Sequence, residues 1–251
     1  MKQGKKEDIV YIDFMAGVAM LMIVLVHSPQ ALIGISDKIT NITSYGEMGC
    51  QCFFLLTGFK LCLSYHRREV SLCKFYLKRW MSIAPLYYLA ICIGFILTRI
   101  YDSPNCPTFL IGCWRQNTDV KAILANILLI HNLFINGNND VVGGGWYIGV
   151  TFLFYILFPL FVSFFDYIHK RFHSLTMFLP FLFWGCMVFI RNICIISGVS
   201  EFINCGYMSF FEQAPCILLG MLLYYQYADG ELDFNIKEKG KLAFLLIILL
   251  I

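Results

Sequence analysis

The chain consists of long apolar segments separated by short polar connectors. Six of the apolar segments approach or exceed the roughly 20 residues that an α-helix needs to cross a bilayer. We therefore predict complete transmembrane spans at residues 9–26, 48–66, 80–98, 141–165, 175–190 and 209–227. The pattern is that of a membrane protein that crosses the bilayer several times.

Two further apolar segments are too short to cross. Residues 122–135 give only 14 residues, and residues 242–251 end the chain after ten. If 122–135 crossed, the connector with Lys170 and Arg171 would lie outside the cell, whereas basic loops tend to face the cytoplasm. We predict that 122–135 is re-entrant or interfacial. We also predict that 242–251 begins a truncated seventh span, so that the single membrane-embedded domain, residues 1–251, is incomplete at its C-terminus. The chain is then a fragment of a longer protein or an unusual gene product.

Composition excludes a soluble domain. The 251 residues are 59% hydrophobic and only 14% charged, and the mean hydropathy is +0.70. Soluble domains carry about 25% charged residues, and a core of this size cannot hide so much apolar surface from water. The fold class predicted is an all-α, polytopic bundle of transmembrane helices in the lipid bilayer.

Basic residues predict the orientation of the chain. Three lysines precede the first span, and no small-residue cleavage site follows it, so we expect an uncleaved first helix and a cytoplasmic N-terminus. The connector after the second span carries five basic residues against Glu69 and is also predicted to be cytoplasmic: Arg67, Arg68, Lys74, Lys78 and Arg79. The net charge of +3 is spread over such connectors and forms no stripe, so nucleic acid is not an expected partner.

The 11 cysteines lie mostly inside apolar segments, where a thiol packs as a small hydrophobe. We interpret them as reduced and structural. Cys106 and Cys113 are an exception, because they fall in a polar loop. If this loop faces an oxidising compartment, the alternative interpretation is that they form a disulfide. No spacing typical of metal ligands occurs, so no metal site is predicted.

Few polar groups lie at membrane depth, and each has a functional and a structural interpretation. His27 ends the first span, where a neutral imidazole is suited to take a proton from an attacking hydroxyl; alternatively, it only hydrogen-bonds a neighbour. Asp13 lies 14 residues earlier, about 21 Å along a helix, so it cannot contact His27 directly and reads as a solvated or capping carboxylate.

The basic connector also has two interpretations. Its side chains could clamp the phosphates of an anionic donor, or they could only set topology and contact lipid headgroups. His131 and Glu212 are interpreted as satisfied packing residues. The segment Gly143–Trp146 lacks the lysine of a phosphate-binding loop and is read as a flexible connection with an interfacial aromatic anchor.

Five motifs occur in the order found in one known family. The first helix reads YIDFMAGVA at residues 11–19 and ends VHS at 26–28, and residues 53–59 read FFLLTGF. Residues 75–80 read FYLKRW, followed by PLYY at 85–88, and residues 146–150 read WYIGV, followed by FPL at 158–160. Residues 218–225 read LLGMLLYY. Over residues 8–227 this order resembles the acyltransferase type 3 family.

The resemblance implies an integral-membrane acyltransferase of the bacterial cytoplasmic (inner) membrane. Such an enzyme transfers an acyl group, commonly acetyl, from acyl-CoA to a hydroxyl of a cell-surface carbohydrate. The implied partners are acyl-CoA as the donor substrate, a surface glycan or lipid-linked saccharide as the acceptor, and the lipid bilayer; no bound cofactor is implied.

On this resemblance His27 is the candidate general base. The candidate donor-binding residues are Arg79, Lys78, Arg67, Arg68 and Lys60. Three further residues have candidate acceptor-binding or structural roles: Asp13, Trp146 and Tyr155.

Three charged positions of the family carry uncharged residues here. Ala16 stands where the first helix usually has an arginine or lysine, Ser82 stands at the second arginine of the basic loop, and Thr151 stands at a frequent glutamate. A divergent branch that uses other cations, an inactive relative, or an altered sequence would each explain this. The rival to an active enzyme is therefore a catalytically inactive relative, or a membrane carrier of lipid-linked sugars on the same scaffold.

Overall fold

The computed structural model describes residues 10–31, 36–67, 71–101, 119–135, 138–139 and 141–230. Within these ranges the secondary structure is helical, apart from an isolated antiparallel bridge between Phe134 and Ile203. Arg68, Cys106, Cys113 and the segment 242–251 lie outside the described residues. The chain divides into two compact units, residues 1–64 with 216–251, and residues 65–215.

The first unit contains α1 (Val10–His27), η1 (Ser28–Ala31), α2 (Asp37–Ser44), η2 (Tyr45–Glu47), α3 (Met48–His66) up to Ser64, and α8 (Phe210–Ala228) from Cys216 onward. Glycines bring its helices together. A Cβ on Gly49 would lie 2.6 Å from the Ala19 carbonyl oxygen, so the start of α3 touches the backbone of α1. Small residues allow this close approach in membrane helices, where van der Waals packing drives association.

The α3–α8 contact uses two glycines in a reciprocal way. A Cβ on Gly58 would overlap the carbonyl oxygen of Ile217, and a Cβ on Gly220 would overlap that of Leu55. The two helices therefore meet backbone to backbone. The glycines belong to the FFLLTGF and LLGMLLYY motifs, which gives these two motifs a packing role.

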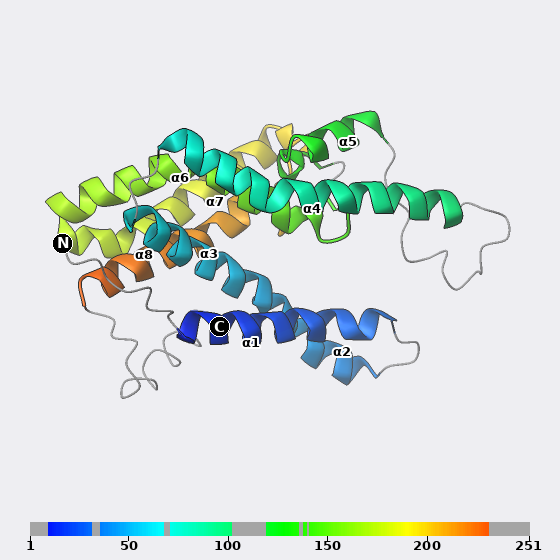
Figure 1. Ribbon diagram of the computed structural model, residues 1–251, viewed down its shortest axis with the longest axis horizontal. Coiled ribbons are helices and arrows are strands. Elements are labelled where there is room, and N and C mark those ends of the chain that lie inside the picture. The colour runs from blue at the N-terminus through cyan, green and yellow to red at the C-terminus, as the bar shows by residue number, and fades with distance from the viewer. Residues whose placement is uncertain are drawn as a thin grey trace. The chain divides into compact units, whose positions relative to one another are not determined.

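The second unit contains α4 (Leu72–Tyr101), α5 (Val120–Ile127), η3 (His131–Leu133), α6 (Gly145–Arg171), η4 (His173–Phe178), α7 (Leu179–Ile196) and η5 (Val199–Glu201). Helices α4 and α6 run antiparallel along one another (Figure 1). The Tyr76 hydroxyl donates to the Ile156 carbonyl oxygen at 3.0 Å, and Phe75 stacks on Phe158 with ring centroids 5.5 Å apart. This stacked pair of aromatic rings stabilises the contact between the two helices.

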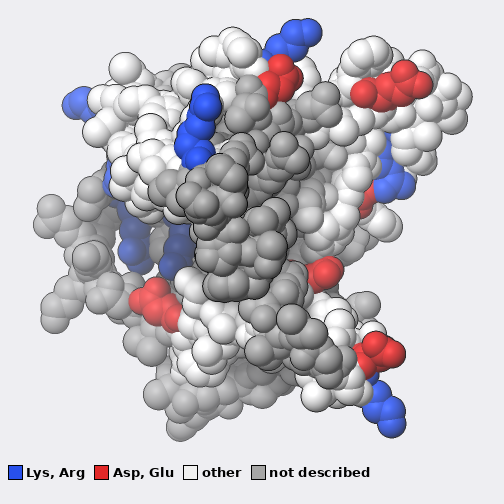
Figure 2. All heavy atoms as spheres, turned by 90° about the vertical axis from the view of Figure 1, so that its right-hand side faces the viewer, with Lys and Arg blue, Asp and Glu red and all other residues white. Residues whose placement is uncertain are grey.

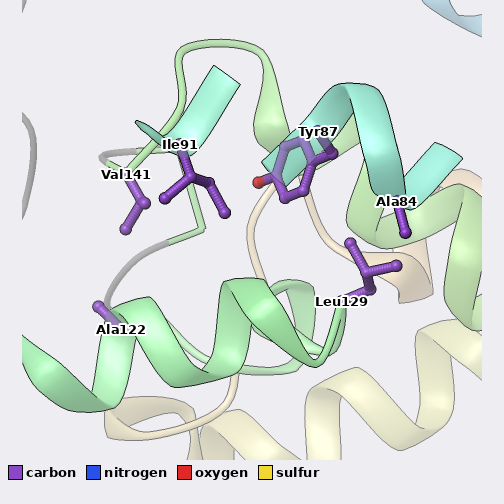
Figure 3. Close-up of a cluster of buried hydrophobic side chains, with 6 residues drawn as sticks. All are labelled: Ala84, Tyr87, Ile91, Ala122, Leu129 and Val141. Atoms are coloured by element: carbon purple, nitrogen blue, oxygen red, sulfur yellow. The ribbon is translucent and has the colours of Figure 1, made fainter. Parts of the chain in front are cut away.

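The α4–α5 contact has a small apolar core (Figure 3). It combines Ala84, Tyr87 and Ile91 of α4 with Ala122 of α5, Leu129 just after α5, and Val141. Leu129 has a φ of 59°, and the Leu129 and Ile130 amides donate to the carbonyls of Asn126 and Ala125. This is a Schellman turn in which a fully buried leucine takes the left-handed position usually given to glycine. The turn directs the chain back toward α6.

Four helices in the described part of the chain are long and apolar enough to cross a membrane: Asp37–His66, Leu72–Arg99, Gly145–Arg171 and His173–Ile196. The apolar helix Tyr11–His27 is shorter. Figure 2 shows one face of the molecule, on which basic and acidic side chains are scattered among uncharged residues. The all-helical, membrane-spanning fold class is confirmed, while the total of six complete spans stays a prediction.

Several predicted boundaries are wrong. Helix α4 begins at Leu72 and not near Trp80, so Lys74, Lys78 and Arg79 lie on a helix and Pro85 lies in its interior. Helix α6 continues to Arg171 through the predicted connector, and α2 was not predicted. Hydropathy marks the part of a helix that suits lipid, whereas backbone hydrogen bonds let a helix continue beyond it. Helix α5 has eight residues, about 12 Å of rise, too short by itself to cross.

Candidate functional site

In the first unit, the candidate base lies at one end of α1. His27 is the last residue of that helix and is exposed. Ser28 follows it in η1, and the Ser28 hydroxyl donates to the Val24 carbonyl oxygen at 2.7 Å. The imidazole is therefore presented at a helix end, where a substrate hydroxyl can approach it.

A cation and an anion pair at the other end of α1. The Lys60 Nζ of α3 lies 3.5 Å from Oδ1 of Asp13, and both side chains are exposed. Ala16 lies three residues from Asp13, about 4.5 Å along the axis. The structure thus places a lysine close to the turn on which the related family usually carries its cation. Asp13 gains a partner that the sequence did not predict.

Ala16 and His27 lie on nearly the same face of α1. Eleven residues correspond to just over three turns and about 16.5 Å of rise. The Lys60–Asp13 pair and the His27 ring thus mark two ends of one helix. A ligand bound at both ends must be elongated.

In the second unit, the candidate donor-binding cation is embedded between aromatic rings. The Arg79 guanidinium carbon lies 5.4 Å from the ring centroid of Phe75 and 5.4 Å from that of Tyr155. Arg79 is half-buried, and its buried Nε atom has no hydrogen-bond partner among the described residues. The Ser82 hydroxyl donates to the Arg79 carbonyl oxygen at 2.8 Å, so the residue in place of the family's second arginine bonds back to its own helix.

Arg79 lies beside the middle of α6. Its partner Tyr155 is ten residues from the start of α6 and sixteen from its end, about 15 Å and 24 Å along the axis. The prediction that Arg79 lies in a loop is therefore wrong, because it lies on α4, while the side of the membrane stays a prediction. A guanidinium that is half-buried among apolar helices is expensive to bury, which makes Arg79 a candidate binding residue.

The other predicted donor-binding residues lie apart from this pair. Lys78 is exposed on α4, and Arg67 is exposed directly after α3. Trp146 and Tyr155 lie on opposite faces of α6. Nine residues separate them, which corresponds to two and a half helical turns and about 13.5 Å along the axis. Trp146 is buried, and its ring lies 6.1 Å from that of Tyr207.

A buried polar network holds the start of α6. His131 is fully buried, and its Nε2 donates to the Gly145 carbonyl oxygen at 2.9 Å. The Tyr87 hydroxyl lies 3.4 Å from that nitrogen and donates to Oδ1 of Asn126 at 2.6 Å. Since a carbonyl only accepts, Nε2 carries a proton. Burial lowers the pKa of His131, although the carbonyls of Gly145 and Ala125 act in the opposite direction.

Asn132 extends the network to the segment after α7. Its side-chain nitrogen lies 2.9 Å from Oδ1 of Asn138 and 2.7 Å from the carbonyl oxygen of Met208. Gly149 of α6 packs closely against Asn132, since a Cβ atom on Gly149 would lie 2.6 Å from the Cβ atom of Asn132. The interpretation of His131 as a satisfied packing residue therefore holds for Nε2, while its buried Nδ1 has no hydrogen bond among the described residues.

Sequence reasoning missed Tyr87, Asn126 and Asn132 as parts of this network. The signal available was two asparagines and a histidine inside an apolar 14-residue segment, which is an unusual density of polar groups there. Thr151, on the next turn of α6, is also buried, and its hydroxyl lacks a partner within the described structure. Glu212 was also interpreted as a lone packing residue, but it pairs with Arg191 of α7.

A family model described as Acyltransferase domain matches residues 9–251, nearly the whole chain. Searches of curated proteins and of solved structures gave no match. The match covers α1 with His27, α4 with Arg79 and α6 with Trp146, which are the helices on which the candidate residues lie.

Proposed function

Because the chain belongs to the Acyltransferase domain family and is an integral membrane acyltransferase, we propose that it moves an acyl group, most simply acetyl, from acyl-CoA to a hydroxyl of a cell-surface carbohydrate. The acceptor is a surface glycan or a lipid-linked saccharide. The proposed location is the bacterial cytoplasmic membrane, with the N-terminus in the cytoplasm.

Arg79 is the observation that carries the choice of donor. A half-buried guanidinium held against two rings, with no acidic partner among the described residues, is suited to bind an anion. Its planar fork suits a phosphate, and the unpartnered Nε adds a donor. Acyl-CoA brings phosphates together with a thioester, which fits a site built for an anionic acyl donor.

Lys60 supports the same donor class in the first unit. It stands close to the turn of Ala16, where the family's usual cation is missing. Asp13 neutralises it in the absence of donor, and an exposed pair of this kind contributes only about 0–1 kcal/mol. A donor phosphate can therefore displace Asp13 at little cost.

His27 is the proposed general base. Its imidazole accepts the proton of the acceptor hydroxyl as the oxygen attacks the thioester carbonyl. The tetrahedral intermediate then collapses, the carbon–sulfur bond breaks and the CoA thiolate leaves, taking up the proton that His27 accepted from the hydroxyl. Base catalysis of this kind contributes typically 10² to 10⁴ in rate.

Membrane vesicles that contain the full-length protein, given radiolabelled acetyl-CoA and cell-envelope polysaccharide, test this function. We expect label in the polysaccharide with the unmodified protein and about 10² to 10⁴ less with His27→Ala. The matched control is His173→Ala, an exposed histidine in η4, which should leave transfer unchanged.

Two outcomes would contradict the proposal. Undiminished transfer by His27→Ala would remove His27 from the mechanism. Absence of labelled polysaccharide even with the unmodified protein would favour an inactive relative or a sugar carrier. This alternative is suggested by the uncharged residues Ala16, Ser82 and Thr151 at positions that are usually charged in the family.

A further inference from the structure

Two neighbouring residues of the second unit, Tyr207 and Met208, cover a pair of buried carboxamides. The Gln213 side-chain nitrogen donates to the Tyr207 carbonyl oxygen at 2.7 Å, and the Asn132 side-chain nitrogen donates to the Met208 carbonyl oxygen at 2.7 Å. Tyr207 and Met208 are themselves exposed. Segment 207–208 therefore lies at the surface, and two side-chain amides hold its backbone from the protein side.

Each of these carboxamides uses only its nitrogen. Gln213 Oε1 and Asn132 Oδ1 are buried, and neither oxygen has a hydrogen-bond partner among the described residues. Both residues are more than nine-tenths buried. The side-chain nitrogen of Asn132 also faces Asn138 Oδ1 and the Trp146 carbonyl oxygen, which settles which end of this amide is the oxygen. Native structures rarely leave a buried acceptor unpaired, so a group that donates hydrogen bonds belongs at these two oxygens.

A buried aromatic ring lies beside the same two amides. The rings of Trp146 and Tyr207 are 6.1 Å apart, with an interplanar angle of 51°. Tyr207 therefore contacts Trp146 with its ring while its carbonyl oxygen accepts from Gln213. An indole next to two carboxamides suits a sugar, because the C–H face of a pyranose packs on an aromatic ring and its hydroxyls both donate and accept hydrogen bonds.

The hydrogen-bonding groups around segment 207–208 are uncharged. Asn138 and Asn204 add two further buried carboxamides, and the Asn204 side-chain nitrogen donates to the Met208 carbonyl oxygen at 3.4 Å. The charged residues closest in sequence to Gln213 and to the end of α7, Glu212 and Arg191, pair with one another. The cluster therefore matches an uncharged hydroxylated ligand better than an anionic one.

The cluster lies at the end of the unit that is predicted to face outward. Trp146 is the second residue of α6, whereas Lys170 and Arg171 end that helix about 38 Å away along its axis. By the positive-inside tendency, the basic end faces the cytoplasm and the cluster faces the other side. A cell-surface carbohydrate is available on that side.

We propose that Trp146, Asn132 and Gln213 form the acceptor subsite for an uncharged sugar ring, and that segment 207–208 occupies this subsite until the sugar displaces it. This rests on the proposed function, which supplies the saccharide acceptor. The Tyr207 ring stands in for the pyranose on Trp146, and the two backbone carbonyls stand in for sugar oxygens at the amide nitrogens.

The exchange of segment 207–208 for a sugar gains hydrogen bonds. Sugar hydroxyls can accept from the same two amide nitrogens and can also donate to Gln213 Oε1 and Asn132 Oδ1. The displaced carbonyls belong to exposed residues, so they turn to water. Two buried oxygens that segment 207–208 leaves unpaired thereby acquire partners.

Binding of oligosaccharides in the absence of acetyl-CoA tests the proposal. Mild acid releases oligosaccharides from the cell-envelope polysaccharide of the transfer assay, tritiated borohydride labels their reducing ends, and anion exchange separates neutral from acidic fragments. Proteoliposomes that contain the full-length protein are sedimented with each fraction. We expect the neutral fraction to bind saturably and the acidic fraction to bind more weakly.

Variants should shift the Kd of the neutral fraction in opposite directions. Gln213→Leu removes one amide from the subsite and should weaken binding about tenfold, the size of one buried hydrogen bond. Tyr207→Ala should instead tighten binding about two- to tenfold, because the sugar then displaces no ring from Trp146. Tyr167→Ala, an exposed tyrosine near the other end of α6, is the control and should leave the Kd unchanged.

Several outcomes would overturn the subsite. These are tighter binding of the acidic fraction, no binding of the neutral fraction, weaker or unchanged binding in Tyr207→Ala, and unchanged binding in a folded Gln213→Leu, which would leave buried water as the partner of Oε1. Thermal unfolding checks that Gln213→Leu folds. If it does not, Tyr207→Ala still decides, because that residue is exposed and a purely structural role would not tighten binding.

Failure of this subsite and failure of the proposed function are distinguishable. His27→Ala should lose transfer and still bind the neutral fraction normally. Neutral oligosaccharide bound by a protein that transfers no acetyl group would contradict acyl transfer and leave the subsite standing. Transfer without any effect of Tyr207→Ala or Gln213→Leu on oligosaccharide binding would do the reverse.

Discussion

The reciprocal glycine contact between α3 and α8 gives the sharpest test of the fold. In Gly58→Ala the new Cβ would overlap the Ile217 carbonyl oxygen and lie 2.9 Å from its carbon and 3.0 Å from the Met221 nitrogen. All three atoms belong to backbone, which cannot rotate away as a side chain can. The helices would have to separate, since carbon contacts are normally about 3.5–4.0 Å.

The expected loss follows from two opposing effects. Overpacking costs about 1–3 kcal/mol, and this overlap with backbone belongs near the upper value. Alanine regains up to about 1 kcal/mol through its helix propensity. The net loss is about 2 kcal/mol, which for a chain of this size lowers the midpoint of thermal unfolding by about 4–8 °C. Gly220→Ala meets Leu55 in the same way and should behave alike.

Thermal unfolding of purified variants in detergent is the assay, and Gly17→Ala is the matched control. Gly17 is also a helix glycine, but a Cβ there meets nothing within 4 Å. Its substitution should leave the midpoint unchanged or raise it slightly. Equal midpoints for Gly58→Ala, Gly220→Ala and Gly17→Ala would refute the close α3–α8 contact.

Two further predictions concern the second unit. Arg79→Ala should raise the KM for acyl-CoA at least tenfold in a transfer assay. Arg79→Lys should recover only part of the donor affinity, because lysine lacks the planar fork of arginine. The control is Lys74→Ala, a substitution of an exposed lysine on the same helix, which should leave the KM unchanged. An unchanged KM in Arg79→Ala would contradict donor binding there. The second prediction is that the free energy of unfolding falls as the pH drops below about 6.5, the ordinary histidine pKa. Burial lowers the pKa of His131 in the folded protein, so the unfolded chain binds the proton more readily. His131→Asn should flatten this pH dependence of the unfolding midpoint, and an unaltered slope would show that other groups cause it.

Hydropathy predicted the existence of the helices better than their ends. The second span, residues 48–66, matches α3, and residues 9–26 and 209–227 match α1 and α8 within one residue. The start of α4 was missed by eight residues because Lys74, Lys78 and Arg79 make its first turns look like a loop. Those turns remain helical because a helix satisfies its own backbone, whatever its side chains face.

The candidate site was only partly predictable for a different reason. His27 and Arg79 could be found because they stand in motifs. The pairing of Lys60 with Asp13, 47 residues away, depends on how α1 packs on α3, and no local pattern reports it. The same is true of Tyr87 and Asn126, 39 residues apart. Side chains that meet through tertiary packing leave no period in the sequence.

The length of α6 sets a condition on the membrane itself. Its 27 residues rise about 40 Å, whereas the hydrocarbon core is about 30 Å thick. The last three residues are charged or titratable and belong in the headgroup region, which leaves about 36 Å to accommodate. A tilt of about 30° does so, within the range of membrane helices. Because Arg79 rests on the flank of this helix, a thinner bilayer would increase the tilt and shift the guanidinium sideways, which couples this candidate donor-binding residue to lipid chain length.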